Sequence, residues 1–158
     1  MKKALTKTKR KSKKIFSSIR RLGLKIKTSV KENKLFYDTI DIVNYIKDNN
    51  LLCGLISGND SLHMKEVLTF LGIDTSLFKC YIGHAEVEHF KPHPEGIFKA
   101  IKCLGENISL NDVCYVGDSL GDMMAASNAG ITGYLIDRNN EYPLSNNYIK
   151  LRSLKDLL

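Results

Sequence analysis

The chain has 158 residues, of which 43% are hydrophobic, a length that suits one domain with a buried core. No apolar run of about 18 residues and no charged-then-apolar leader is present, so neither a membrane span nor export is indicated. The four cysteines are widely spaced, and the four histidines show no zinc-like pairing with them. We therefore expect reduced core thiols, surface or capping histidines and a cytoplasmic protein.

Positive charge is concentrated at the amino terminus. Residues 1–34 hold 14 Lys or Arg and one acid, Glu32, whereas the remainder holds 10 basic and 16 acidic residues. A lysine-rich block of this kind is typical of a solvated tail, with a nucleic-acid or anionic-membrane surface as the alternative. Apolar residues within 15–30 recur with helical spacing. The alternation of apolar residues at 22–26 would instead fit a strand, although Lys25 and Lys27 argue against a central parallel strand. We divide the chain into a basic segment, 1–34, and a core domain, 35–158.

The core domain alternates between helical and strand patterns. In chain order we expect a helix at 39–49, a strand at 51–56, a helix at 61–70, a short strand at 79–82, a helix at 94–104, a strand at 113–116, a helix at 119–128, a strand at 131–136 and a final short helix at 153–158. Such alternation predicts a doubly wound, Rossmann-like α/β fold, in which a parallel sheet has helices on both faces.

Polar residues follow the strand predicted at 51–56. Ser57 and Gly58 begin a turn that leads through Asn59 into the next helix. A hydroxyl and the free backbone N–H groups of a glycine-containing turn before a helix can hold a phosphate. The alternative is that Ser57 only satisfies its own turn.

A lysine precedes two prolines at the start of the helix predicted at 94–104. Pro92 stiffens the chain after Lys91, and Pro94 suits a first helical position. Most lysines are solvated surface residues, but a lysine on so rigid a turn can direct one charge at one place. Lys91 is therefore a candidate for binding an anionic group.

Two acids follow the strand predicted at 113–116. Asp118 comes at its carboxyl end, where open α/β sheets bind ligands. Ser119 is expected to cap the next helix, whose first turn brings Asp122 back over the same edge, and Gly130 is expected to end that helix. Helix capping alone would account for Asp122, but an ionised Asp118 in a crevice needs a cation or a donor. Convergent carboxylates with room for water suit Mg²⁺.

Together these three segments resemble the haloacid dehalogenase-like hydrolase superfamily, most closely its phosphoglycolate phosphatase-like branch, over roughly residues 35–137. The resemblance implies that Ser57 and the backbone of Gly58 and Asn59 bind phosphate. It implies that Lys91 also binds phosphate and balances the charge of the reacting groups. It implies further that Asp118 and Asp122 hold Mg²⁺ or order its shell, and that the substrate is a small phosphorylated metabolite.

The family's nucleophile has no counterpart in the sequence. In the family it is the first acid of an Asp-x-Asp turn after the first core strand, and no such turn precedes Ser57. The nearest approach, at residues 38–41, has the wrong spacing and begins a helix. We therefore expect that the first core strand is missing and that residues 1–34 are a tail or a remnant of the family's cap helix. The resulting gap would leave unpaired strand edges, which favour a homo-oligomer or a complementing chain.

Three functional hypotheses follow, in order of preference. The first is a Mg²⁺-dependent phosphate monoester hydrolase of this type, truncated and with little or no activity as given. The second is a non-catalytic regulatory protein that binds phosphate and Mg²⁺. The third is a nucleic-acid-associated protein that acts through its basic head, although residues 1–14 lack interleaved aromatic side chains for base stacking.

Overall fold

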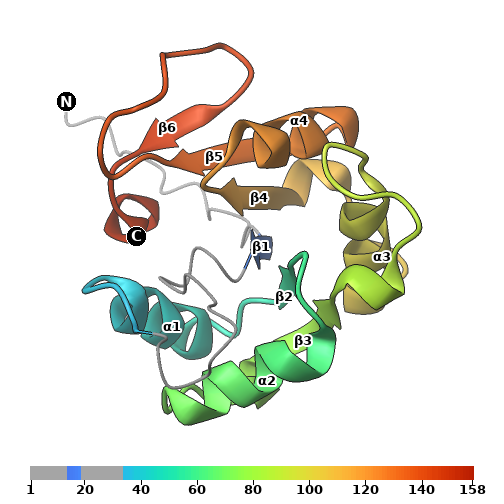
Figure 1. The fold of residues 1–158 in the computed structure, drawn as a ribbon, viewed down its shortest axis with the longest axis vertical. Coiled ribbons are helices and arrows are strands. Elements are labelled where there is room, and N and C mark those ends of the chain that lie inside the picture. The colour runs from blue at the N-terminus through green and yellow to red at the C-terminus, as the bar shows by residue number, and fades with distance from the viewer. Residues whose placement is uncertain (1–13, 19–33) are drawn as a thin grey trace, which may run out of the picture.

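The computed structural model describes residues 14–18 and 34–158 as a three-layer α/β arrangement (Figure 1). Its strands are β1 (Lys14–Ser18), β2 (Cys53–Ile56), β3 (Phe78–Ile82), β4 (Val113–Gly117), β5 (Thr132–Ile136) and β6 (Ile149–Leu151). Its α-helices are α1 (Thr39–Asp48), α2 (Ser61–Phe70), α3 (Glu95–Leu104) and α4 (Leu120–Asn128). Short 3₁₀ turns are η3 (Thr75–Leu77), η4 (His84–Glu86), η5 (Leu110–Asp112) and η6 (Leu154–Leu157). The predicted fold class is confirmed, and the final predicted helix is the 3₁₀ turn η6.

The strands form one parallel sheet in the order β3-β2-β1-β4-β5-β6. This is the strand order of a doubly wound sheet, in which the chain winds outward from the centre in both directions. Strands β2 and β4 are buried along their whole length, as expected for strands covered on both faces.

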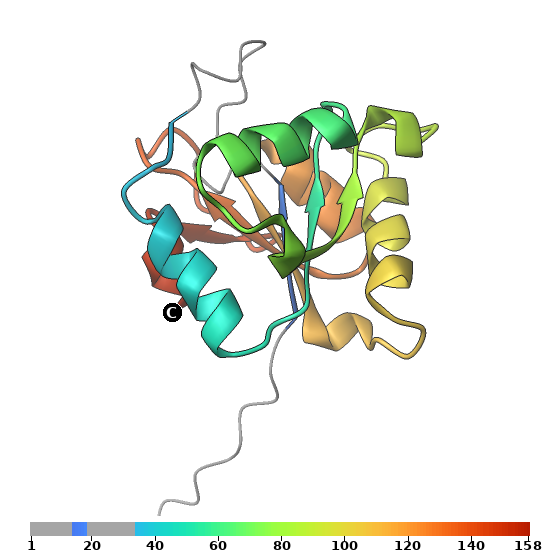
Figure 2. The same ribbon diagram turned by 90° about the horizontal axis from the view of Figure 1, so that it is seen from below.

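The prediction that the first core strand is missing is wrong. Strand β1 lies between β2 and β4, with Ile15 opposite Cys53 on one side and Cys114 on the other (Figure 2). Its residues come from the segment assigned to the basic head, where only two of five, Ile15 and Phe16, are apolar. Pairing along both edges satisfies the backbone of this short strand and closes the expected gap. The reason for expecting a complementing chain at the inner edges is thereby removed.

Apolar side chains pack on both faces of the sheet. One cluster joins α1, α2 and η6 to Leu55 and Val116, and the other joins α3 and α4 to Ile56 and Tyr115. Successive strand residues face opposite sides, which is why neighbours in β4 belong to different clusters. None of the helices in the described ranges is long and apolar enough to cross a membrane. The alternation noted at 22–26 lies outside the described residues, as do residues 19–30 of the helical spacing noted at 15–30 and residues 1–13 and 19–33 of the predicted basic segment 1–34.

Candidate functional site

The carboxyl ends of β2, β1 and β4 lie next to one another at one edge of the sheet (Figure 2). Ser57 follows β2 and Asp118 follows β4, so the end of β1 lies between them. Their Cα atoms are therefore about two strand spacings, roughly 10 Å, apart. The described end of β1 carries Ser17 and Ser18, and the sequence contains no Asp or Glu before Glu32.

The turn after β2 is held by backbone and hydroxyl hydrogen bonds. The Ser57 N–H donates to the Ile82 carbonyl of β3 over 2.9 Å, and the Ser57 hydroxyl accepts from the Asn59 N–H at 3.2 Å. The Ser57 hydroxyl thus orders its own turn, as the alternative interpretation of this residue proposed. Its proton can still be donated to a ligand, because a hydroxyl both accepts and donates.

Gly83, at the end of β3, makes this close packing possible. A Cβ at residue 83 would lie 2.5 Å from the Asn59 carbonyl oxygen and 2.7 Å from the Ser61 nitrogen. Glu86 reinforces the contact, accepting from the Gly83 N–H at 2.6 Å and from the Ser61 hydroxyl at 2.8 Å. Sequence reasoning missed both residues, although a glycine directly after a predicted strand was an available signal.

Two contacts with α4 hold the Lys91 turn, one through Pro92 and one through Lys91. The Asn128 side-chain amide at the end of α4 donates to the Pro92 carbonyl at 3.0 Å, and the Lys91–Pro92 peptide bond is cis. Helix α3 begins at Glu95, one residue later than predicted, so Pro94 immediately precedes the helix and does not occupy its first position. The Lys91 ammonium lies 2.6 Å from Asp122 Oδ1, while its side chain keeps 29% of its surface exposed.

Asp122 is almost wholly buried and surrounded by donors. Besides Lys91, Oδ1 accepts from the Tyr115 hydroxyl at 3.2 Å, while Oδ2 accepts from the Ser119 hydroxyl and from the Ser119 N–H at 3.2 Å. The predicted cap is confirmed, since the Ser119 hydroxyl also accepts from the Asp122 N–H, and Gly130 follows the helix with φ +70°. Sequence reasoning missed the Tyr115 hydroxyl, because an aromatic residue inside a buried strand is typical of a core position.

The predicted site residues fall into two groups around this edge. Ser57, Gly58 and Lys91 line one cavity of about 120 Å³, together with His89 and His93. Asp118 is half-buried and lines a second cavity of about 180 Å³, whose wall includes Arg138 and Tyr142. Asn59 is not among the residues that line either cavity, and its N–H is engaged by Ser57. Asp122 connects with the first group through Lys91.

Two acids near the predicted site have structural roles. Asp38 is fully buried at the start of α1 and accepts hydrogen bonds from Arg138, Ser153 and Leu154 at 2.7–2.8 Å. Asp60 caps α2, accepting from the Leu62 and His63 N–H groups. Neither carboxylate is therefore positioned as a replacement for the family's nucleophile.

Two known proteins share extensive sequence similarity with this chain. A pyrophosphatase, PpaX, from Anoxybacillus flavithermus is 34% identical over 101 residues, which is 64% of this chain and 44% of the relative. A phosphoglycolate phosphatase from Yersinia pestis is 33% identical over 104 residues, covering 66% of this chain and 44% of the relative. The chain thus spans a little under half the length of these relatives. By name, the first relative is a pyrophosphatase and the second a phosphatase.

Solved structures give the same result for the fold. A haloacid dehalogenase-like hydrolase from Bacteroides fragilis superposes with a TM-score of 0.69 and 27% identity, covering 82% of this chain and 62% of that protein. The sequence profile described as haloacid dehalogenase-like hydrolase matches residues 1–136. The chain therefore belongs to the haloacid dehalogenase-like hydrolase family.

Proposed function

We propose that this chain binds the phosphate group of a small phosphorylated metabolite in the cavity lined by Ser57, Gly58 and Lys91. The observation that carries the proposal is the placement of Lys91, which is fixed by buried Asp122 and lines the same cavity as the Ser57 turn. An ammonium group has three donors, so contact with Asp122 leaves others for phosphate oxygens.

Magnesium belongs to this proposal, and the residues present fit it. Mg²⁺ is commonly held by one or two carboxylates together with waters and substrate phosphate. Asp118, half-buried at the end of β4 on a cavity wall, would be the carboxylate ligand. Asp122 would act indirectly, since its oxygens accept from Lys91, Tyr115 and Ser119. Bound Mg²⁺ would supply positive charge at the carboxyl end of β4, which lies across the end of β1 from Ser57.

Hydrolysis by this chain is proposed to be at most a trace. The sequence has no Asp or Glu before Glu32, so neither β1 nor the 13 residues that follow it contain a carboxylate that could attack phosphorus. Losing a covalent nucleophile removes several orders of magnitude in rate, and the remainder comes from positioning and electrostatics. The same absence favours the second hypothesis, a non-catalytic protein that senses phosphate and Mg²⁺, as the alternative function.

The test is calorimetric binding of 2-phosphoglycolate and of inorganic phosphate to the full chain with Mg²⁺. We expect saturable binding that weakens about tenfold in Ser57→Ala, the loss of roughly one charge-assisted hydrogen bond. Ser109→Ala is the matched control, because the Ser109 hydroxyl also accepts from the N–H two residues ahead, at 3.3 Å. Absence of binding, or equal loss in both variants, would contradict the phosphate site.

A further inference from the structure

Three potential metal ligands gather at the mouth of the Ser57–Lys91 cavity. One ring nitrogen each of His89 and His93 and a carboxylate oxygen of Glu95 lie within 4.8 Å of one another. No other group of three such side chains meets in the ranges 14–18 and 34–158 that the structure describes. Both histidines flank Lys91 on the turn that leads into α3, and both line the cavity.

The cluster is partly organised before any metal enters. His89 Nδ1 lies 3.0 Å from Glu95 Oε2, and the two imidazole rings are 4.6 Å apart between centroids. Ligand atoms around tetrahedral Zn²⁺ lie about 3.4 Å apart, given metal–ligand bonds of roughly 2.0–2.2 Å. The widest gap in the cluster must therefore close by no more than about 1.5 Å. Both histidine side chains are exposed, so rotation about their side-chain bonds can supply this movement.

The charge of Glu95 suits a cation. Oε1 receives Lys99 and Glu88, whereas Oε2 receives the N–H and ring of His89. Oε2 therefore lies against the His89 imidazole, while His93 Nδ1 accepts from the Glu95 backbone N–H at 3.2 Å. Two imidazoles and one carboxylate form the donor set of many catalytic zinc sites, in which the fourth position stays open.

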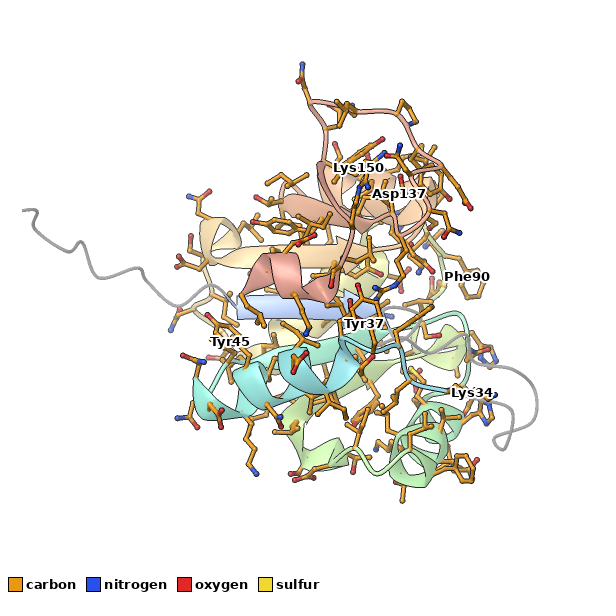
Figure 3. All side chains as sticks on the ribbon, turned by 90° about the vertical axis from the view of Figure 1, so that its left-hand side faces the viewer. Lys34, Tyr37, Tyr45, Phe90, Asp137 and Lys150 are labelled. Atoms are coloured by element: carbon orange, nitrogen blue, oxygen red, sulfur yellow. The ribbon has the colours of Figure 1, made fainter. Side chains whose placement is uncertain are left out.

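We propose that His89, His93 and Glu95 form a Zn²⁺ site at the mouth of the cavity, with three protein ligands and an open fourth position. This site is separate from the proposed Mg²⁺ site at Asp118, and its existence does not depend on phosphatase activity. Bound Zn²⁺ would add a second positive charge to the cavity wall that His89 and His93 share with Lys91. Phe90, 57% exposed, projects into solvent from the same turn (Figure 3).

The experiment is titration of Zn²⁺ into the chelator-stripped full chain by calorimetry, with inorganic phosphate absent. We expect one equivalent to bind, with affinity reduced at least about tenfold in His89→Ala and in His93→Ala. Circular dichroism of each variant verifies that it is folded, which is expected because both side chains are exposed.

Two control variants separate this cluster from other Zn²⁺ ligands. His63→Ala removes a histidine that also faces a carboxylate, Glu66, at 3.7 Å but belongs to α2. Cys103→Ser removes the exposed thiol. Both variants should bind Zn²⁺ as the unmodified chain does. The proposal is overturned if the chain binds no Zn²⁺, if both cluster variants bind it unchanged, or if binding is lost only with Cys103.

Discussion

Two buried carboxylates, Asp38 before α1 and Asp122 in α4, belong to elements that pack on opposite faces of the sheet, and they organise their surroundings in different ways. Asp38 receives both arms of the Arg138 guanidinium, at 2.7 and 2.8 Å, and is closed off by Ser153 and Leu154 from the carboxyl terminus. Asp122 is paired with one cationic side chain, that of Lys91, at 2.6 Å, and Lys91 lines a cavity. The first network fastens the end of the chain to α1, and the second directs a charge into a cavity.

The difference lies in the cation that each acid holds. A guanidinium can donate two parallel hydrogen bonds to one carboxylate. The Arg138 guanidinium also lies over the Phe36 ring, 4.3 Å from the ring centroid. An ammonium is a point charge whose remaining donors stay available. Arg138 thus completes a closed structural network, whereas Lys91 is anchored at one point and open to a ligand.

Breaking the closed network should have the largest effect on stability. Asp38→Ala leaves Arg138 partly buried without its partner, which typically costs about 3–5 kcal/mol. We expect this loss in urea unfolding of the full chain. Asp41→Ala is the control, because Asp41 forms an exposed pair with Lys155 at 2.9 Å and should change stability by no more than about 0.5 kcal/mol. Similar losses in the two variants would refute the distinction.

Breaking the open network should affect ligand binding. Lys91→Gln removes the positive charge from the cavity, and Asp122→Asn removes the charge that anchors Lys91. Each should weaken phosphate binding by about tenfold or more, since a hydrogen bond to a charged group contributes about 1.5–3 kcal/mol. Lys155→Gln removes an exposed lysine outside both cavities and should leave binding unchanged. If Lys91→Gln binds phosphate normally, Lys91 has no role in this site.

Low pH should reduce the stability of the protein through the ion pair of Asp137 and Lys150, next in sequence to Arg138 of the Asp38 network (Figure 3). Burial raises the pKa of Asp137, but hydrogen bonds from Lys150 and two backbone N–H groups outweigh it and lower the pKa to about 2. Stabilisation by such a group is complete above its unfolded pKa near 3.8 and is lost as the pH falls toward 2. Thermal unfolding should therefore show a smaller drop in Tm over this range in Asp137→Asn. An identical drop in both proteins would exclude this contribution.

Much of the fold was predictable because local signals agreed with burial. The helix predicted at 61–70 is found at those bounds, since Asp60 caps its start and Gly72, at φ +72°, follows its end. Strand β1 was not predictable from its two apolar residues, because pairing with β2 and β4 stabilises it. Strand β6 was missed as well, since three residues at a sheet edge carry little pattern.

The site was predictable at the level of strand ends. The sequence pattern predicted that Ser57, Lys91 and Asp122 lie at one edge of the sheet, and the structure places Lys91 against Asp122. The pattern did not indicate which side chains donate hydrogen bonds to Asp122. Lys91 and Asp122 are 31 residues apart, and their contact depends on how α3 and α4 pack on the sheet. The roles of these residues in phosphate and Mg²⁺ binding remain predictions.

The central claim is that phosphate binding persists where covalent catalysis lacks its nucleophile. The most direct test is hydrolysis of p-nitrophenyl phosphate by the purified chain with Mg²⁺, beside Asp118→Asn, at protein concentrations where phosphate binding is saturated. We expect at most a trace rate and no burst of nitrophenolate in either protein. Rapid turnover that Asp118→Asn abolishes would contradict this expectation, because another group would then have taken over the attack on phosphorus.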